Sequence, residues 1–395
     1  MNTLGGFDDI DKELRTLRDR QMYRRRRQLD SAQGREVETG GRRLLDFCSN
    51  DYLGLAADPR VREACKAGVD RWGVGSGASH LVCGHMAVHH ELEEALAAFT
   101  RRPRALLFSS GYAANVGVIN ALTGVGDHVF EDRLNHASLL DGGWLSRAHF
   151  HWYRHRDTAH LEARLATAEG DRKLVVTDGT FSMDGDVCEL GELVGVARRQ
   201  GAWLMVDDAH GMGVHGAGGC GVVDPHAHGT ADVPVLVGTL GKAFGTAGAF
   251  VAGDEGLIET LIQRARNYIY TTALPPAVAA ATLASLDIVR GEAWRRERLA
   301  ELVSRFRAAA QDLGLELLDS VTPIQPILLG EPGQAVAASA ALEEQGLLVG
   351  AIRPPTVPKG TSRLRVTFNA THTDQDLDRL LSGLESCLTN VPGGA

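Results

Sequence analysis

The feature that best indicates the fold is the stretch Val235-Leu236-Val237-Gly238-Thr239-Leu240-Gly241-Lys242-Ala243-Phe244-Gly245-Thr246-Ala247-Gly248, where a short apolar run ends in a glycine-rich turn. Lys242 is the only charged residue between Asp232 and Asp254. Burial among uncharged groups disfavours the ammonium form of a lysine and lowers its pKa. A neutral amine is a nucleophile that forms Schiff bases. The alternative is a turn lysine that points to solvent, as most lysines do. The rest of the sequence is needed to distinguish these two interpretations.

The composition is that of an ordinary globular protein. The chain has 395 residues, of which 44% are hydrophobic and 23% charged, and this length predicts more than one domain. The net charge of -9 argues against a general nucleic-acid binder. No apolar run approaches the roughly 18 residues of a membrane span, and the N-terminus lacks the pattern of a signal peptide. We therefore expect a cytoplasmic protein with neither a nucleic-acid nor a membrane partner.

Cysteines and histidines give no metal motif. None of the 6 cysteines forms a C-x-x-C pair, which favours buried free thiols in a reducing compartment. His85 and His89 are four residues apart, but Met86 follows His85, so the H-E-x-x-H pattern is absent. We expect no metal site.

Short apolar segments alternate with helical segments through the middle of the chain. Strands are predicted over residues 104–108, 127–130, 174–177, 203–206, 233–237 and 249–252. This alternation predicts an α/β fold with a mostly parallel central sheet and helices on both faces. We expect an N-terminal helix and strand segment over residues 1–50, with a polar helix at 7–30, a large domain over 51–290 and a C-terminal α+β domain over 291–395. Strands of the C-terminal domain are predicted near 314–318, 325–329 and 363–368.

Polar motifs follow the predicted strands, at the edge where open α/β sheets bind ligands. After the strand at 104–108, a small-residue turn leads into a helix, and amides at a helix N-terminus suit a phosphate. Gly111 and Tyr112 are the candidates for such contacts, although an ordinary strand-to-helix turn has the same composition.

Acidic and basic side chains converge at the ends of these strands. Asp207, His210 and Lys242 follow two of them, and His136 and Ser182 follow two earlier ones. An aspartate beside a neutral lysine suits pyridoxal 5'-phosphate, because the lysine forms an imine with its aldehyde and the aspartate pairs with its pyridinium N–H. His136 can stack on the cofactor ring.

Two nucleotide-binding motifs are excluded. The glycine-rich segment 73–79 follows a helix and has the wrong spacing for a dinucleotide fingerprint. A P-loop fails as well, because its early glycine would fall on Leu236 and Ala243 follows the lysine in place of Ser or Thr.

Five motifs together resemble a known family. In chain order they are S-G-Y-A-A-N, D-R-L-N-H-A-S, F-S-M-D-G-D, V-D-D-A-H-G and T-L-G-K-A-F-G. They resemble the α-oxoamine synthases, fold-type I enzymes that use pyridoxal phosphate, and the match runs from about Asp8 to Ser386. Departures from the family pattern occur at Cys48, Asn135, Met212 and the pair Ser79-His80, and they flank the chemical residues without replacing them.

The resemblance also implies roles for individual residues. Lys242 is expected to bind the cofactor aldehyde and to move the Cα proton, Asp207 to pair with the pyridine nitrogen, and His136 to stack on the ring. The expected cofactor contacts also include His210, Ser182, Thr239, Gly111 and Tyr112, with Thr271 and Thr272 reaching the partner subunit. The expected substrate contacts are His136, Arg24, Asn50, Arg353, Thr356 and Arg365.

Within the family, the segments 49–55, 269–272 and 351–358 resemble those members that act in biotin biosynthesis. The implied reaction is the decarboxylative condensation of L-alanine with a pimeloyl thioester of CoA or of an acyl carrier protein. It yields 8-amino-7-oxononanoate, CO2 and the free thiol carrier, in a homodimer with its active site at the subunit interface. One alternative is a glycine-using relative such as glycine C-acetyltransferase (2-amino-3-ketobutyrate CoA ligase). The other is a catalytically silent scaffold subunit, which is expected to lack the Lys242 amine.

Overall fold

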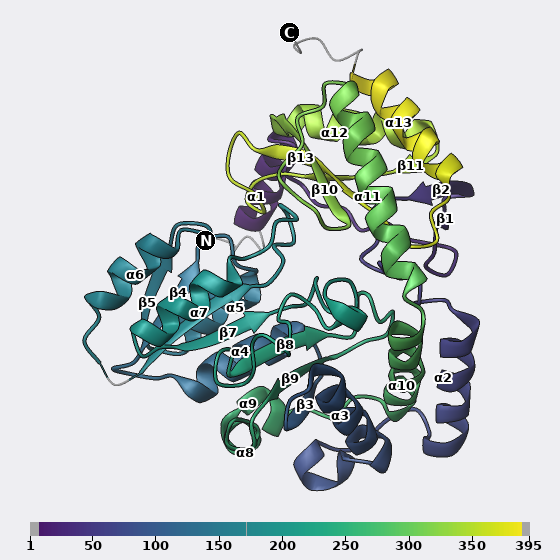
Figure 1. Ribbon diagram of the computed structural model, residues 1–395. Coiled ribbons are helices and arrows are strands. Elements are labelled where there is room, and N and C mark those ends of the chain that lie inside the picture. Colours follow the sequence, from purple (N-terminus) through teal and green to yellow (C-terminus); the bar gives the residue numbers. More distant parts are fainter. Residues whose placement is uncertain (1–7, 171, 389–395) are drawn as a thin grey trace, which may run out of the picture. The chain divides into compact units, whose positions relative to one another are not determined.

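The computed structural model describes residues 8–170 and 172–388 (Figure 1). The chain divides into two compact units. The large unit comprises residues 50–182 and 186–299, and the small unit comprises the segments before residue 50 and after residue 299 together with 183–185.

A seven-stranded sheet forms the centre of the large unit, in the order β3-β9-β8-β7-β6-β4-β5 (Figure 1). Only β9 runs antiparallel to its neighbours, so the predicted mostly parallel α/β sheet is confirmed. The strands are β3 (Arg104–Phe108), β4 (His128–Asp132), β5 (His149–Tyr153), β6 (Lys173–Asp178), β7 (Trp203–Asp207), β8 (Val235–Thr239) and β9 (Ala249–Gly253). The sequence analysis missed β5, because this edge strand is only partly buried and has no apolar run.

The large unit also contains helices before, between and after these strands. They are α2 (Pro59–Trp72), the π-helical turn η1 (His80–Gly84), α3 (Ala87–Thr100), α4 (Gly111–Leu122), α5 (Ala137–Leu145), α6 (Thr158–Ala166), α7 (Leu190–Arg199), η2 (Ala217–Gly219), α8 (Glu255–Arg264), α9 (Arg266–Ile269) and α10 (Pro276–Gly291). The following helix, α11 (Trp294–Asp312), begins in the large unit and continues into the small one. Among the described residues, no helix has both the length and the apolar character to span a membrane.

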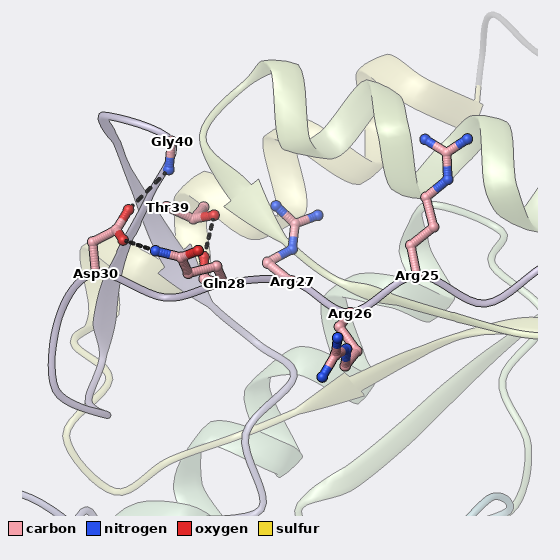
Figure 2. A pocket seen from close by; sticks show the side chains of 7 residues that line it. All are labelled: Arg25, Arg26, Arg27, Gln28, Asp30, Thr39 and Gly40. Atoms are coloured by element: carbon pink, nitrogen blue, oxygen red, sulfur yellow. Dashed lines mark hydrogen bonds between the residues drawn. The ribbon is translucent and has the colours of Figure 1, made fainter.

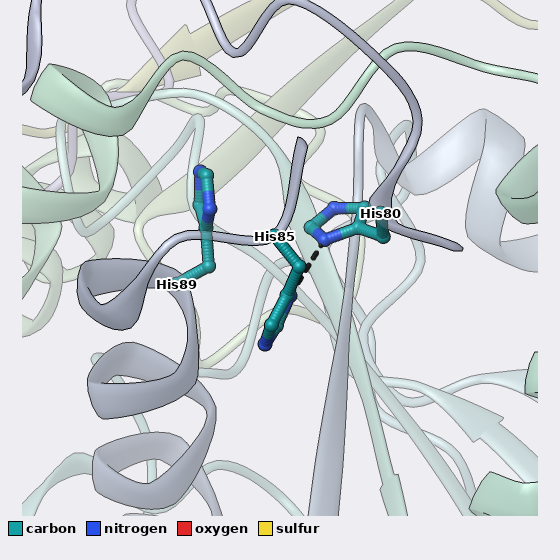
Figure 3. Close-up of side chains that lie close together, drawn as sticks. All are labelled: His80, His85 and His89. Carbon is teal, nitrogen blue, oxygen red and sulfur yellow. Dashed lines mark hydrogen bonds between the residues drawn. The ribbon is translucent and has the colours of Figure 1, made fainter. Parts of the chain in front are cut away.

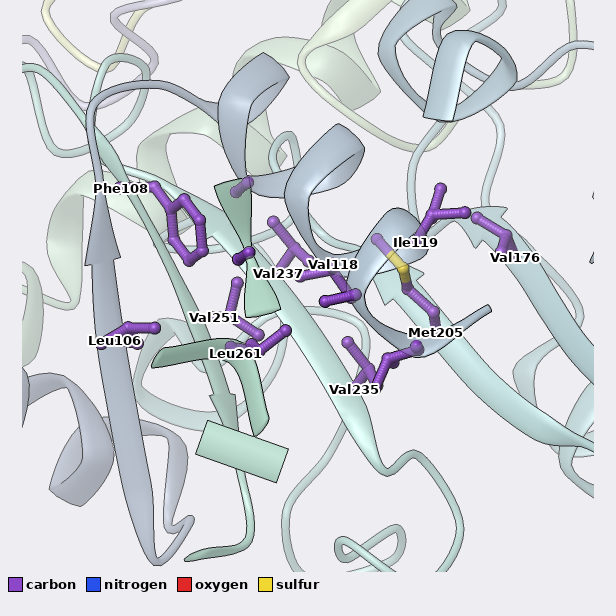
Figure 4. Packing of buried hydrophobic residues seen from close by; sticks show 14 of the residues in the cluster. Leu106, Phe108, Val118, Ile119, Val176, Met205, Val235, Val237, Val251 and Leu261 are labelled. Carbon is purple, nitrogen blue, oxygen red and sulfur yellow. The ribbon is translucent and has the colours of Figure 1, made fainter. Parts of the chain in front are cut away.

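The core of the large unit lies between the sheet and α4 (Figure 4). Val235 and Val237 are two residues apart on β8, so both side chains point to the same face of the sheet. Val118 and Ile119 of α4 are fully buried in the same cluster. This packing fixes α4, and with it the turn that precedes the helix, against the carboxyl ends of the strands.

Two hairpin strands and the C-terminal strands build the small unit. β1 (Glu36–Thr39) and β2 (Arg42–Asp46) are joined by Gly40 and Gly41, both with positive φ (55° and 74°), as a tight two-residue turn requires. β2 also pairs in parallel with β11 (Leu347–Leu348). A second sheet contains β10 (Ile324–Gly330), β13 (Ser362–Thr367) and β12 (Gly350–Ile352), and the helices are α1 (Asp8–Asp19), α12 (Pro332–Glu344) and α13 (Asp374–Leu388).

Two local predictions in the small unit are wrong. The predicted helix at 7–30 ends at Asp19, and Gln21 adopts a positive φ of 56°. Beyond it, a helix would place the guanidinium groups of Arg24 to Arg27 within one turn, where like charges repel. The strand predicted at 314–318 is reduced to a single bridge between Leu317 and Ile327.

The packing of α2 against α10 leads to a first prediction, at Gly68. A Cβ added there would lie 2.9 Å from both Ala277 Cα and Ala280 Cβ, whereas one added at Gly191 of α7 would meet no atom within 4 Å. We expect Gly191→Ala to be neutral or stabilising by up to about 1 kcal/mol, since alanine favours helices. Gly68→Ala should lower the free energy of unfolding by about 1–3 kcal/mol because of overpacking. Urea unfolding of both variants measures the difference, and equal effects would contradict this packing.

A second prediction concerns pH and the loop after β5. His155 Nδ1 lies 3.0 Å from Asp132 Oδ1, and its Nε2 lies 2.8 Å from Asp186 Oδ2. Burial alone would lower the pKa of His155, but the two carboxylates outweigh it and raise the pKa to about 9. A pKa raised on folding stabilises the protein below the unfolded pKa of about 6.5, and this stabilisation is lost as pH rises through 9.

We therefore expect His155→Gln to cost roughly 3 kcal/mol at pH 6, since one pKa unit corresponds to about 1.4 kcal/mol. The cost should shrink steadily towards pH 9.5. Urea unfolding of both proteins across this range measures it. A cost that does not change with pH would show that the ring is held as a neutral group.

Candidate active site

A pocket of about 220 Å³ opens at the carboxyl ends of the central strands of the large unit. It is lined by Gly111, Tyr112, Asn115, His136, Ser138, Asp178, Asp207, Ala209, His210, Thr239 and Lys242. They are the last residues of β6, β7 and β8 together with residues that follow β3, β4, β7 and β8. This is the edge predicted for a ligand site.

One end of the pocket is the N-terminus of α4. Ser110 caps the helix, with its Oγ accepting a hydrogen bond from Ala113 N at 3.1 Å. The amides of Gly111 and Tyr112 lie in the first turn, where N–H groups have no partner within the helix and the helix dipole favours an anion. A Cβ at Gly111 would meet no atom within 4 Å, so a ligand can approach this backbone closely.

Asp207 occupies the end of β7 and is 4% exposed. Its Oδ1 accepts a hydrogen bond from Ala209 N at 2.9 Å, and its Oδ2 accepts one from Asn115 Nδ2 at 2.6 Å. Asp178 lies opposite on β6, and burial followed by the charge of Asp207 raises the pKa of Asp178 well above its usual range. The site thus holds a fixed carboxylate beside a carboxyl group that favours its neutral form.

His136 is held at the N-terminus of α5 by both its backbone and its ring. Its backbone N–H donates to Asp178 Oδ2 at 2.6 Å. Its ring Nδ1 lies 2.8 Å from Ser138 Oγ and accepts a bond from Ser138 N at 3.3 Å. Burial lowers the pKa of His136, although the nearby Asp207 opposes this shift. The ring is therefore neutral at pH 7, and with Nδ1 accepting, its proton lies on Nε2.

A chain of hydrogen bonds connects Asp207 to His136. Asn115 donates one Nδ2 hydrogen to Asp207 and the other to Ser138 Oγ at 2.8 Å. Ser138 Oγ is then free to donate its own proton to His136 Nδ1. The Asp207 carboxylate thereby fixes the orientation of the amide and, through the serine, the tautomer of the histidine.

His210 lies just beyond the end of β7. Its Nδ1 is 2.6 Å from the hydroxyl of Tyr52, and that hydroxyl is 3.3 Å from Asn50 Oδ1. Tyr52 is fully buried, so the phenol is a rigid support for the imidazole. Asn50, predicted to lie near the acyl substrate, is therefore linked to His210.

Lys242 stands in the turn after β8 and is half-buried. The turn is closed by hydrogen bonds from Leu240 N to Gly248 O and from Thr246 N to Leu240 O, both at 2.9 Å. Gly245 has a φ of 65°, and a Cβ there would lie 2.3 Å from Ala56 N. Only glycine fits this position, so the backbone on either side of Lys242 is fixed.

The structure brings together seven of the residues predicted for the cofactor: Lys242, Asp207, His136, His210, Thr239, Gly111 and Tyr112. Ser182, Thr271 and Thr272 also belong to the large unit but are not among the residues that line this pocket. Asn115, Ser138, Asp178 and Tyr52 were given no role by the sequence analysis. The first three lie within or next to the quoted motifs, so their position was visible although their contacts were not.

The remaining predicted substrate residues belong to the small unit. Arg24 Nη2 donates to Thr356 Oγ1 at 3.2 Å, and Arg353 donates to the carbonyl of Gln21. Arg365 is buried on β13. Arg24, Thr356 and Arg353 thus lie near one another, although 332 positions separate Arg24 from Thr356.

The arginine run does not act as one group (Figure 2). Arg25, Arg26 and Arg27 border a hollow of about 530 Å³ in the small unit. Arg27 is paired with Glu343, its Nη1 lying 2.8 Å from Oε1. Asp30 closes the hollow on one side, accepting hydrogen bonds from Gln28 Nε2 and Gly40 N. This hollow is larger than the Lys242 pocket, but none of the residues that line the Lys242 pocket lines it.

Residues 42–384 match the family model of aminotransferase class I and II. A curated 8-amino-7-oxononanoate synthase of Pseudomonas putida (strain GB-1) is 60% identical over 379 residues, covering 96% of this chain and 97% of that protein. One from Pseudomonas aeruginosa (strain UCBPP-PA14) is 61% identical over 376 residues, covering 95% and 94%. The chain belongs to the 8-amino-7-oxononanoate synthase family. The resemblance drawn from the five motifs is confirmed, and members of this family are PLP-dependent acyltransferases.

Solved structures agree with this assignment. The 8-amino-7-oxononanoate synthase of Francisella tularensis has a TM-score of 0.77 at 31% identity and covers 88% of this chain and 98% of its own. The serine palmitoyltransferase of Sphingomonas wittichii has a TM-score of 0.91 at 34% identity, with 98% of both chains covered. The 8-amino-7-oxononanoate synthase family and this serine palmitoyltransferase therefore share the fold found here.

The hydrogen-bond chain in the pocket predicts the tautomer of His136. In protein labelled with 15N-histidine, the ring should carry its proton on Nε2. Ser138→Ala should reduce the preference for this tautomer roughly 2- to 10-fold, since a neutral hydrogen bond contributes about 0.5–1.5 kcal/mol. Two-bond 1H–15N correlation spectra measure it, with the His136 signals assigned from a His136→Gln variant.

Ser146→Ala is the matched control, because Ser146 is also buried at an end of α5 but donates to Gly143 O. It should leave the His136 signals unchanged. A proton found on Nδ1 in the unaltered protein would contradict the hydrogen-bond chain.

Proposed function

We propose that this protein condenses L-alanine with a pimeloyl thioester, with loss of CO2, to give 8-amino-7-oxononanoate and the free thiol carrier in biotin biosynthesis. Pyridoxal 5'-phosphate is the proposed cofactor. The observation that carries the proposal is the grouping of a lysine amine, a fixed carboxylate and a helix N-terminus in one pocket of about 220 Å³. Membership of the 8-amino-7-oxononanoate synthase family supports it.

The pocket fits this cofactor on three counts. The Asp207 carboxylate is buried and fixed through both oxygens, as a partner for a pyridinium N–H must be. The first turn of α4, together with the Thr239 hydroxyl, suits a phosphate. Asn115 Oδ1 is buried without a partner among the described residues, so the pocket has a polar atom left for a ligand.

The cofactor, when bound, supplies an electron sink for the negative charge that develops at the amino acid Cα. Asp207 would hold the proton on the pyridine nitrogen and so maintain that sink. Lys242 Nζ would hold the aldehyde at rest, then remove the Cα proton and later return one to the same carbon. His136, fixed as the Nε2–H tautomer, would stack on the ring, while His210, supported by Tyr52, would donate to a ring or substrate oxygen. Ser182 is proposed as an additional contact to the ring.

Arginine side chains are proposed to recognise the substrate carboxylates. A pimeloyl chain ends in a carboxylate, and L-alanine carries another, so a site for both needs cationic donors. Arg353 and Arg365 are proposed to hold a substrate carboxylate. Arg24, Thr356 and Asn50 are proposed to contact the acyl substrate, and the first two are already hydrogen-bonded to each other. Thr271 and Thr272 are proposed to reach the phosphate of the partner subunit in a homodimer.

The choice of amino acid separates this proposal from its relatives. Glycine C-acetyltransferase uses glycine, and a serine palmitoyltransferase shares the fold. The identity of 60% to 8-amino-7-oxononanoate synthases, against 34% to that serine palmitoyltransferase, favours L-alanine. Release of the free thiol from pimeloyl-CoA and from pimeloyl carrier protein should be fastest with L-alanine. Faster release with glycine or L-serine would overturn the substrate assignment while leaving the cofactor assignment intact.

A prediction follows for Lys242 itself. Borohydride reduction of the PLP-loaded protein should attach the pyridoxyl group to Lys242, and peptide mass spectrometry locates it. Lys242→Ala should abolish both this label and turnover. Lys66→Ala should change neither, since Lys66 is an exposed lysine paired with Glu63. A pyridoxyl group found on another lysine would overturn the assignment.

Asp207→Ala should reduce kcat by about 10²–10³-fold, which is the usual cost of removing one group that stabilises developing charge. The borohydride label on Lys242 should persist in this variant. This separates loss of the electron sink from loss of the lysine, and an unchanged kcat would exclude Asp207 as the partner of the pyridine nitrogen.

A further inference from the structure

Three side chains around the start of α3 converge outside the pocket of Lys242. His85 lies two residues before α3, while His90 and Glu93 are three residues apart on α3, so both lie on one face of the helix. One ligand atom from each of the three lies within 4.8 Å of the other two. His85 Nε2 is 3.9 Å from Glu93 Oε2.

A neighbouring histidine that spacing alone would include is not available as a ligand (Figure 3). His89 Nδ1 accepts a hydrogen bond from Met86 N at 3.0 Å, so its proton must lie on Nε2. That Nε2 lies 2.6 Å from Leu274 O and donates to it. Both nitrogens of His89 are thus engaged, and the ring is a structural link between α3 and the segment that contains Leu274.

His80 contacts the Nδ1 atom of His85, and this contact leaves His85 Nε2 available for a ligand role. The Nδ1 atoms of the two rings are 2.8 Å apart, so a proton lies between them (Figure 3). When His85 donates this proton, its Nε2 presents a lone pair towards Glu93. His80 is buried and stacks on Tyr268, with ring centres 5.1 Å apart and planes at 12°. An imidazole held at Nδ1 by a fixed neighbour is the usual arrangement behind a metal-binding histidine.

Glu93 is anchored as well. Its Oε1 accepts a hydrogen bond from Leu107 N at 2.9 Å, which leaves Oε2 directed towards His85. His85 and His90 are exposed to solvent, whereas Glu93 is buried. His90 is 3.4 Å from Glu94, but this exposed pair is weak and easily exchanged.

We propose that His85, His90 and Glu93 form a binding site for a divalent transition-metal ion, with Zn²⁺ as the preferred ion. Two imidazoles and one carboxylate, with a fourth position open to water, are a donor set that Zn²⁺ accepts. A tetrahedral zinc holds its ligand atoms about 3.3 Å apart, so the three groups need to approach by roughly an ångström. The exposed rings of His85 and His90 can do this by side-chain rotation.

A metal ion at this site would tie His85, which follows η1, to α3. The carbonyl of Leu274 accepts a hydrogen bond from His89 of α3 and another, at 2.6 Å, from Ser76 Oγ in the segment before η1. Leu274 follows Thr272 by two residues and Thr271 by three, so the ion would stiffen the end of that segment. The role assigned is structural and does not depend on the reaction proposed for the Lys242 pocket.

The test is a titration of the metal-free, PLP-loaded protein with Zn²⁺ by calorimetry, and with Co²⁺ by visible absorption. We expect one saturable equivalent, a Co²⁺ spectrum of tetrahedral nitrogen and oxygen ligation, and a rise in melting temperature with Zn²⁺. His90→Ala and Glu93→Gln should each weaken Zn²⁺ binding at least tenfold; Gln can still accept from Leu107 N. His80→Phe keeps an aromatic ring against Tyr268 but removes the hydrogen bond to His85, and should weaken binding roughly 10- to 100-fold.

His226→Ala is the matched control, since His226 is an exposed histidine elsewhere in the large unit, and it should bind Zn²⁺ as the unaltered protein does. Three results would overturn the site. They are no saturable Zn²⁺ binding to the unaltered protein, undiminished binding in both His90→Ala and Glu93→Gln, or equal weakening in His226→Ala.

Discussion

The buried carboxylate of Asp207 is the constraint on which the rest of the site depends. A carboxylate that is 4% exposed is costly unless every oxygen is hydrogen-bonded and a positive partner is near. The backbone after β7 satisfies one oxygen and Asn115 satisfies the other. Asn115 can do so only because α4 is packed on the sheet by Val118 and Ile119. Core packing on one side of α4 thus fixes the position of the Asn115 amide, which hydrogen-bonds the Asp207 carboxylate.

Lys242 is held by a different kind of constraint. Its turn follows β8, the strand that neighbours β7, and it is closed by backbone hydrogen bonds and by the fit of Gly245 against Ala56. Lysine side chains are flexible, so placing one amine opposite one carboxylate requires a rigid backbone beneath it. The glycines that make the stretch look like an ordinary turn are therefore the reason that the lysine is positioned.

The sequence predicted the sheet well and the supporting contacts poorly, and seven of the residues that it named for the cofactor line one pocket. Apolar strands and the polar residues after them are local features, so Asp207, His136, His210 and Lys242 were found. The bond from Asn115 to Asp207 joins residues 92 positions apart, and Tyr52 and His210 are 158 apart. No local pattern encodes such pairs. The same limit explains β5, whose partly buried edge position depends on the sheet and not on its own composition.

Histidines show most clearly why contacts, and not spacing, decide function. His136, His89 and His85 each have a partner at Nδ1. In His136, which lines the pocket, the partner leaves the proton on Nε2. In His89 the second nitrogen is used by Leu274, so the ring only supports the fold. In His85 the Nδ1 partner is His80, and when His85 donates the shared proton its Nε2 carries a lone pair. The spacing of His85 and His89 suggested one pair with one role, whereas their hydrogen bonds give them opposite roles. The ring nitrogen that remains after the structural contacts are made is the one that chemistry can use.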